Sequence, residues 1–210
     1  MKLLNEINPH NEMLPKSKIL YSSVKHAIDI VISICFLTTL SPLFLLVVLL
    51  IKADSPGAVF YTQERIGLGG VPFYIIKFRT MHTDAEKNGP QWADHFDPRI
   101  TKVGYYLRKY RIDEIPQFFN ILRGEMSIIG PRPERLVFIE EFEKDLPNFR
   151  NRLQVKPGIT GLAQINGGYE LSPSEKLELD LQYIYQFSFL LDLKIFLKSI
   201  PVILFSKGWR

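Results

Sequence analysis

Two carboxylates stand side by side in the stretch RIDEIPQFFN, which runs from Arg111 to Asn120. Asp113 and Glu114 come just before Pro116, and proline is favoured at the first position of a helix. The amino end of a helix carries partial positive charge and unpaired N–H groups, so we expect it to keep Asp113 ionised. Capping needs only one acidic residue. The pair is therefore either a solvated Asp-Glu pair or a reactive group, since an ionised carboxylate can attack phosphorus.

Basic side chains surround this pair. They are Lys77 and Arg79 in the KFRTM motif, Arg108 and Arg111 just upstream, and Arg132 in the GPRP motif. Guanidinium groups match the geometry of phosphate oxygens. Two carboxylates beside a phosphate site normally require a divalent cation, and Mg²⁺ is the usual ion. The constellation predicts metal-assisted phosphoryl transfer with Asp113 and Glu114 as metal ligands, and the alternative is a set of scattered, solvated surface charges.

The composition is compatible with such a site. The chain has 210 residues, of which 46% are hydrophobic and 23% charged, which excludes a disordered protein. Its formal net charge of +4 favours a partner that carries phosphates, such as an anionic lipid, a nucleotide or a nucleic acid. Cys35 is the only cysteine, which excludes an internal disulfide and a metal cluster built from thiolates.

An uncharged apolar run from Ile30 to Ile51 is long enough to cross a membrane, for which about 20 residues suffice. Ser41-Pro42 interrupts its middle, where proline removes a helix hydrogen bond and favours a kink. Basic residues flank both ends, which places both ends on the cytoplasmic side. These features predict a re-entrant membrane helix over residues 18–54, and a kinked single span is the alternative. Asp29, four residues after Lys25, is expected to pair with it at the interface.

Local patterns predict the elements that would position the charged residues. Residues 59–61 and 73–78 are rich in β-branched and aromatic side chains, and glycines between them predict a β-hairpin. A helix is expected to begin at Pro116 and to end at Gly124, and an acidic helix is expected over residues 134–149. Residues 156–165 are expected to form a glycine-rich loop or strand.

A capping box at Ser172 and Glu175 predicts a late helix with Leu177, Leu181 and Ile184 on one face. Asp180 falls on that apolar face, where a carboxylate must be either functional or paired with an internal Arg or Lys. The final apolar, lysine-bearing segment could lie in the membrane interface as an amphipathic helix or pack in the core. Overall, the sequence predicts an α+β fold that is mostly helical with a small β-hairpin. We expect a polar segment over 1–17 and a catalytic domain over 55–210 that forms one unit with the membrane helix over 18–54.

Three long motifs carry a resemblance to a known family. They are TQERIGLGGVPFYIIKFRTM, DPRITKVGYYLRKYRIDEIPQFFNILRGEMSIIGPRP and VKPGITGLAQINGGYELSPSEKLELD. The chain resembles the bacterial sugar transferases, which are monotopic polyprenyl-phosphate phosphoglycosyl transferases, from about Lys18 to about Lys198. The Ser41-Pro42 break also matches the re-entrant helix of that family.

The resemblance implies a reaction and its partners. A sugar-1-phosphate would pass from a UDP-sugar to membrane polyprenyl (undecaprenyl) phosphate, with release of UMP, as the first membrane step of exopolysaccharide, capsule or other glycan synthesis. The implied location is the cytoplasmic face of the bacterial inner membrane. The implied partners include membrane lipid and downstream glycosyltransferases but no nucleic acid, and the implied cofactor is Mg²⁺. The sequence leaves open the sugar, the polyprenyl length and the oligomeric state, for which a homodimer is one option.

The resemblance also implies roles for single residues. Asp113 corresponds to the nucleophile that forms a covalent phospho-sugar intermediate, and Glu114 to a residue that supports metal binding or proton handling. Four further residues correspond to substrate- and phosphate-binding positions: Lys77, Arg108, Arg132 and Asp180. Arg79 joins this set through its place in the KFRTM motif.

One position departs from the family pattern, because Gly168 stands where many relatives carry an arginine. Any contact made by that arginine is therefore in doubt for this chain. Two alternatives to covalent catalysis also stay open. The Asp-Glu pair could deprotonate or orient the acceptor phosphate for direct transfer. The chain could instead be an inactive membrane scaffold for glycan assembly, although a scaffold has no need to keep Asp113, Glu114 and Arg108 together.

Overall fold

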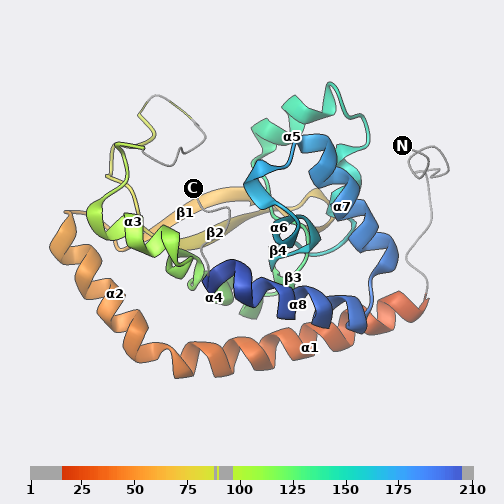
Figure 1. The fold of residues 1–210 in the computed structure, drawn as a ribbon, viewed down its shortest axis with the longest axis horizontal. Helices are drawn as coiled ribbons and strands as arrows, with labels where there is room; N and C mark the ends of the chain where they lie inside the picture. Colours follow the sequence, from red (N-terminus) through yellow and green to blue (C-terminus); the bar gives the residue numbers. More distant parts are fainter. Residues whose placement is uncertain (1–15, 88, 90–96, 205–210) are drawn as a thin grey trace.

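The computed structural model describes residues 16–87, 89 and 97–204, and it confirms the α+β fold (Figure 1). Helices dominate, and the strands form one antiparallel hairpin and one short parallel pair. Most of the polar segment predicted for residues 1–17 lies outside the described residues.

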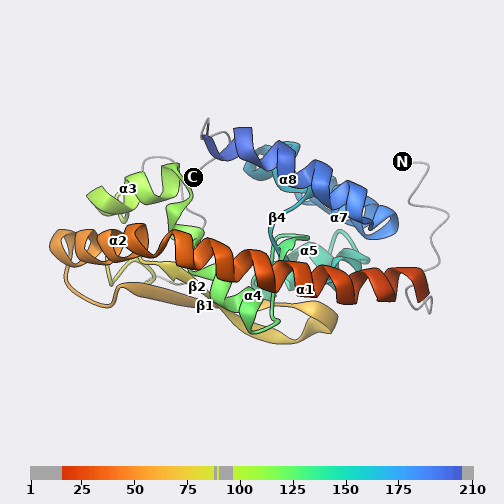
Figure 2. The ribbon, with the colours of Figure 1, turned by 90° about the horizontal axis from the view of Figure 1, so that it is seen from below.

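A long bent rod forms one edge of the molecule (Figures 1 and 2). It consists of α1 (Lys16–Thr39) and α2 (Ser41–Asp54), which are separated at Leu40. The hydroxyl of Ser41 donates to the carbonyl of Thr38 at 2.8 Å, and Pro42 has no N–H to continue the helix. The interruption therefore lies at the predicted place. Within α1, residues Leu20–Thr39 are long and apolar enough to cross a membrane.

The first half of α1 lies against the body of the protein through a polar stripe. Lys25 Nζ pairs with Asp192 at 2.6 Å, and the Ser127 hydroxyl donates to Asp29 Oδ2 at 2.6 Å. The predicted Lys25–Asp29 ion pair is therefore wrong, because α8 (Phe189–Leu204) brings Asp192 within reach of Lys25. One face of α8 is buried there, whereas Leu190 and Leu197 on its other face are exposed.

The hairpin lies along one side of the molecule in the view of Figure 2. Strand β1 (Phe60–Ile66) pairs with β2 (Pro72–Phe78), with Phe60 opposite Phe78 and Ile66 opposite Pro72. Gly69 and Gly70 in the connection have positive φ angles of 65° and 84°, which glycine adopts without strain. The predicted hairpin is confirmed, although β1 extends beyond the predicted segment 59–61 to Ile66.

Short elements follow the hairpin. They are α3 (Lys102–Lys109), α4 (Gln117–Leu122), β3 (Ser127–Ile129), α5 (Leu136–Glu143), β4 (Gly158–Thr160) and α6 (Leu162–Ile165). Strands β3 and β4 pair in parallel. The acidic helix predicted over 134–149 is wrong in length, because α5 ends at Glu143 and Pro147 disfavours helical geometry in the residue before it. Phe149 instead turns into the core.

The capping box at the start of α7 (Pro173–Gln186) is confirmed. Ser172 Oγ accepts from the Glu175 N–H, and Glu175 Oε2 accepts from the Ser172 N–H at 2.8 Å. Helix α7 then packs Leu177, Leu181 and Ile184 into the larger hydrophobic cluster. A second cluster joins the rod to the hairpin and to α3. In it, Val47 and Ile51 of α2 pack with Phe78 of β2, Leu107 of α3 and Ile115.

We predict that Gly104→Ala destabilises the protein. A Cβ at this position of α3 would overlap the backbone carbonyl of Thr80, which is not free to move because it accepts the Thr101 N–H at 3.0 Å. The free energy of unfolding should fall by about 1–3 kcal/mol, the usual cost of overpacking. Chemical denaturation in detergent measures it. Lys102→Ala, at an exposed position of the same helix, serves as the control. A Gly104→Ala protein as stable as wild type would contradict this packing.

Candidate active site

Asp113 and Glu114 lie in a single 3₁₀ turn, Ile112–Glu114, between α3 and α4. The residue before it, Arg111, has a φ of 54°, the only described non-glycine residue with positive φ, and this turns the chain sharply. Helix α4 begins at Gln117, so the pair precedes the helix by one turn rather than capping it. Both residues are buried, with exposed fractions of 7% and 6%.

Glu114 is matched by two cations. Its Oε1 accepts from Arg132 Nη2 at 2.6 Å and from Lys77 Nζ at 3.0 Å. Burial alone would raise the pKa of Glu114, but Arg132 and Lys77 outweigh it and hold that pKa well below its usual range. Glu114 is therefore a fixed anion at neutral pH.

The charge of Asp113 is compensated less than that of Glu114. Lys77 Nζ lies 3.9 Å from Asp113 Oδ2, farther than the cations that bind Glu114. Burial raises the pKa of Asp113 more than Lys77 lowers it, and the negative charge of Glu114 adds to the rise. The expected lowering by a helix end is therefore not found, because the pair sits one turn outside the helix in a buried place. The two adjacent carboxyls thus have pKa values shifted in opposite directions.

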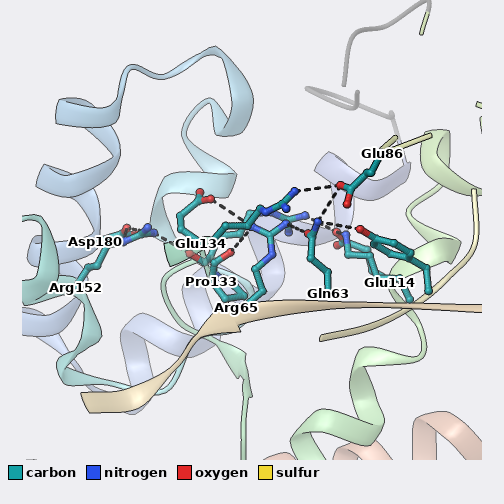
Figure 3. A network of polar contacts seen from close by, with 12 residues as sticks. Gln63, Arg65, Glu86, Glu114, Pro133, Glu134, Arg152 and Asp180 are labelled. Carbon is teal, nitrogen blue, oxygen red and sulfur yellow. Dashed lines mark hydrogen bonds and ion pairs between the residues drawn. The ribbon is translucent and has the colours of Figure 1, made fainter. Parts of the chain in front are cut away.

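A cavity of about 420 Å³ is lined by Asp113, whereas Glu114 lies behind its wall, bound to the lining residues Lys77 and Arg132. Most of the charged side chains that line it are basic: Arg65, Lys77, Arg79, Arg99, Arg108, Arg111, Arg132, Arg135, Arg152 and Lys176. Its acidic lining residues are Glu86, Asp113, Glu134 and Asp180. Figure 3 shows several of these side chains, among them Arg65, Glu86 and Asp180, within one network of polar contacts. Such a lining favours a ligand that carries several negative charges.

Arg108 and Arg79 differ in what they can offer a ligand. Arg108 Nε donates to Thr80 Oγ1 at 3.0 Å, while its Nη1 is buried and has no hydrogen-bond partner among the described residues. This leaves a donor that a phosphate oxygen would satisfy. The Arg79 guanidinium donates to the carbonyl and hydroxyl of Ser55 at 2.7 and 3.0 Å. Arg79 thus holds the end of α2 in this structure.

Asp180 lies on the cavity wall and has an internal arginine partner. Its Oδ2 lies 2.7 Å from Arg152 Nη2, and the exposed fractions of the two side chains are 1% and 4% (Figure 3). Burial raises the pKa of Asp180 more than the positive charge of Arg152 lowers it. The paired alternative for Asp180 is therefore confirmed. Sequence reasoning missed Arg152, because its place near Asp180 follows from the packing of α7 on the turn Phe149–Gln154.

The residues present fit a divalent cation only with help from a substrate. Within the described chain, no group of three His, Cys, Asp or Glu side chains could hold a metal ion. Asp113 supplies a carboxylate at the cavity, and the carboxylate of Glu114 lies next to it, bound to Lys77 and Arg132. Mg²⁺ is commonly bound by one or two carboxylates together with substrate phosphates and water, so this donor set is sufficient for it.

Residues 20–206 match the family of bacterial sugar transferases. The chain is 42% identical over 206 residues to the UDP-N-acetylgalactosamine-undecaprenyl-phosphate N-acetylgalactosaminephosphotransferase of Aeromonas hydrophila, covering 97% of this chain and 48% of that protein. It is 37% identical over 210 residues to the UDP-glucose:undecaprenyl-phosphate glucose-1-phosphate transferase of Caulobacter vibrioides, covering 95% of this chain and 79% of that protein.

A third relative is the exopolysaccharide production protein ExoY of Sinorhizobium fredii, which is 40% identical over 199 residues, with 88% of this chain and 87% of that protein covered. The chain therefore spans about half the length of the Aeromonas relative and most of the other two. The match runs through the hairpin, the Asp113-Glu114 turn and the helices that close the cavity. The chain thus belongs to the bacterial sugar transferase family.

Proposed function

We propose that this protein transfers a sugar-1-phosphate from a UDP-sugar to a membrane polyprenyl phosphate and releases UMP. The observation that carries the proposal is buried Asp113, which lines a cavity rich in cations and stands next to Glu114, whose pKa is shifted in the opposite direction. Two of the relatives described above are named for this type of reaction, one with glucose and one with N-acetylgalactosamine. The sugar is therefore not part of the proposal.

The donor diphosphate fits the cationic part of the cavity. Arg108 offers the unpartnered Nη1, and Lys77 and Arg132 carry positive charge on the side of Glu114. Phosphate oxygens placed there would be held close to Asp113, because Lys77 Nζ lies within 4 Å of both carboxylates. Binding thus brings the phosphorus that bears the sugar to the nucleophile.

Asp113 performs the first step as a nucleophile. Its carboxylate oxygen forms a bond to the phosphorus that bears the sugar, and the bond from that phosphorus to the oxygen of UMP breaks. In the second step a phosphate oxygen of the polyprenyl phosphate attacks the same phosphorus and the bond to Asp113 breaks. Glu114 stays ionised throughout, since its pKa is well below the usual range. We therefore assign it to holding cations rather than to proton handling.

Mg²⁺ is proposed as the cofactor, with Asp113 and Glu114 as its protein ligands and donor phosphate oxygens as further ligands. When bound, the ion would offset the negative charge that accumulates on the diphosphate. The positive side chains of Lys77, Arg108 and Arg132 would offset the same negative charge.

Direct transfer is the alternative, and one observation favours it. The raised pKa of Asp113 would suit a group that accepts a proton from the acceptor phosphate. The scaffold alternative is weaker, because the buried carboxyl of Asp113 and the unpartnered donor of Arg108 belong to residues that line the same cavity.

The rod of α1 and α2 is proposed to enter the cytoplasmic face of the bacterial inner membrane and return. Apolar side chains cover its free surface, including Leu45, Leu46 and Leu49 of α2. The end of α2 is bound to the start of α3, the helix that carries Arg108. There Asp54 Oδ2 accepts the N–H of Val103 at 3.0 Å. A membrane-bound acceptor could therefore reach the cavity from the rod side.

We predict that Asp113→Asn abolishes turnover. The amide keeps the shape of the side chain but removes the charge that attacks phosphorus, so UMP release should fall by roughly 10³-fold or more. The assay uses UDP-glucose and UDP-N-acetylgalactosamine with undecaprenyl phosphate. Glu140→Gln, at an exposed position of α5, is the control and should keep full activity. Asp113→Asn with a tenth of wild-type turnover would exclude Asp113 as nucleophile, and no UMP release by wild type from either donor would count against the proposed reaction.

We predict that metal removal abolishes the same activity. Two carboxylates and a diphosphate repel one another unless a cation is present. Excess EDTA should stop UMP release, and added Mg²⁺ or Mn²⁺ should restore it, whereas added Na⁺ at equal ionic strength should not. Undiminished turnover in EDTA would exclude the metal.

We predict that both ends of the rod face the cytoplasm. Ser17→Cys and Ala53→Cys, each made in a Cys35→Ala background, should resist a membrane-impermeant thiol reagent in intact bacterial cells. Both should react after the cells are permeabilised, which controls for access. Labelling at position 17 from outside would instead support a kinked single span.

A further inference from the structure

Residues 130–135 connect β3 to α5 without regular secondary structure, although they carry Arg132 at the active site. Pro131 and Pro133 stand on both sides of Arg132 and have no N–H groups to donate. The carbonyl oxygens are therefore the main backbone groups by which this segment can be held. In such a segment, the direction of the Arg132 side chain depends on what binds those carbonyls.

Each of three successive carbonyls is bound by a different element. Pro131 accepts the Gly158 N–H of β4 at 2.9 Å. Arg132 accepts from Arg152 Nη2 at 2.8 Å, and Pro133 accepts from Arg65 Nη1 of β1 at 3.2 Å. Figure 3 shows Arg65 approaching this segment from the hairpin and Arg152 approaching it from the opposite side. We call these three hydrogen bonds the carbonyl clamp.

The central bond of the carbonyl clamp depends on Asp180. Asp180 Oδ2 accepts from Arg152 Nε at 3.0 Å and lies 2.7 Å from Arg152 Nη2. The Arg152 guanidinium also lies 5.0 Å from the centre of the Phe149 ring. The guanidinium is thus fixed between a carboxylate, an aromatic ring and the Arg132 carbonyl, and it has almost no exposed surface.

We propose that Asp180 is a positioning residue: through Arg152 it fixes the backbone of Arg132 and so keeps the Arg132 side chain on Glu114. Contacts connect the whole path, from Asp180 to Arg152, from Arg152 to the Arg132 carbonyl, and from Arg132 Nη2 to Glu114 Oε1 at 2.6 Å. Asp180 is only 1% exposed, and its carboxylate already holds Arg152. It therefore acts on the reaction through Arg132 rather than by touching the substrate.

A double-mutant cycle separates these two roles. Asp180→Asn should lower kcat/KM for UMP release by roughly 10–100-fold, the usual effect of losing a residue that orients an active-site ligand. Arg132→Lys should be damaging by itself. Adding Asp180→Asn to Arg132→Lys should then change kcat/KM by less than about 3-fold, because the side chain that Asp180 positions is already gone. Losses that multiply in the double variant would show that Asp180 acts independently of Arg132, which would overturn the proposal.

A second variant covers the case in which Asp180→Asn fails to fold. Removing only the carboxylate leaves the buried charge of Arg152 unpaired, which is costly. Asp180→Asn combined with Arg152→Met removes both the charge and the hydrogen bond to Arg132. This protein should fold and still lose activity about 10–100-fold. The matched control is Glu143→Gln with Arg150→Met, a more exposed ion pair nearby, which should keep activity. An Asp180→Asn/Arg152→Met protein with wild-type turnover would refute the proposal that Asp180 and Arg152 position Arg132.

Hydrogen exchange tests the carbonyl clamp without any turnover. The rate measurements rest on the proposed function, whereas this one does not. In the Asp180→Asn/Arg152→Met protein, the Gly158 amide that binds Pro131 should exchange about 10-fold faster or more. The Ile76 amide, which binds Asn120 Oδ1 at 3.0 Å, should keep its rate. Unchanged exchange at Gly158 would overturn the proposal, even if no sugar donor supports turnover.

Discussion

The site depends on one shared carboxylate oxygen. Glu114 Oε1 accepts from both Arg132 and Lys77, which come from an irregular segment and from the hairpin. A buried anion needs such partners, because charge that is removed from water without compensation is strongly unfavourable. Lys77 Nζ also lies 3.9 Å from Asp113, so in the proposed reaction the same contact would define where a phosphate binds. The hairpin, the turn at 112–114 and the segment after β3 all have to meet for this contact to exist.

The rod of α1 and α2 is tied to the body of the protein at three places. The first half of α1 binds the body through Lys25 and Asp192, and the end of α2 packs on α3. Arg79 adds a third link, since its guanidinium holds Ser55 just after α2. In the proposed reaction this arrangement keeps the carboxyl pair at a fixed depth relative to the lipid that carries the acceptor.

Local patterns in the sequence were sufficient for the hairpin, the break at Ser41-Pro42 and the capping box of α7, because each depends on residues close together in the chain. The Asp113-Glu114 pair was also visible as a motif. The sequence did not predict that burial would shift their pKa values apart, or that Asp180 would meet Arg152. The Lys25–Asp192 pair was missed for the same reason, since it joins residues that are distant in the chain. The prediction of a helix over 134–149 followed composition and overlooked Pro147.

The most direct test of this account is the site of covalent labelling. Wild-type protein in detergent would be incubated with Mg²⁺ and a UDP-sugar, without polyprenyl phosphate, then quenched and digested for peptide mass mapping. The account predicts about one UMP released per chain and one sugar-phosphate added to Asp113, with the adduct removed when undecaprenyl phosphate is supplied. A sugar-phosphate on Glu114, or UMP released only when the acceptor is present, would contradict it.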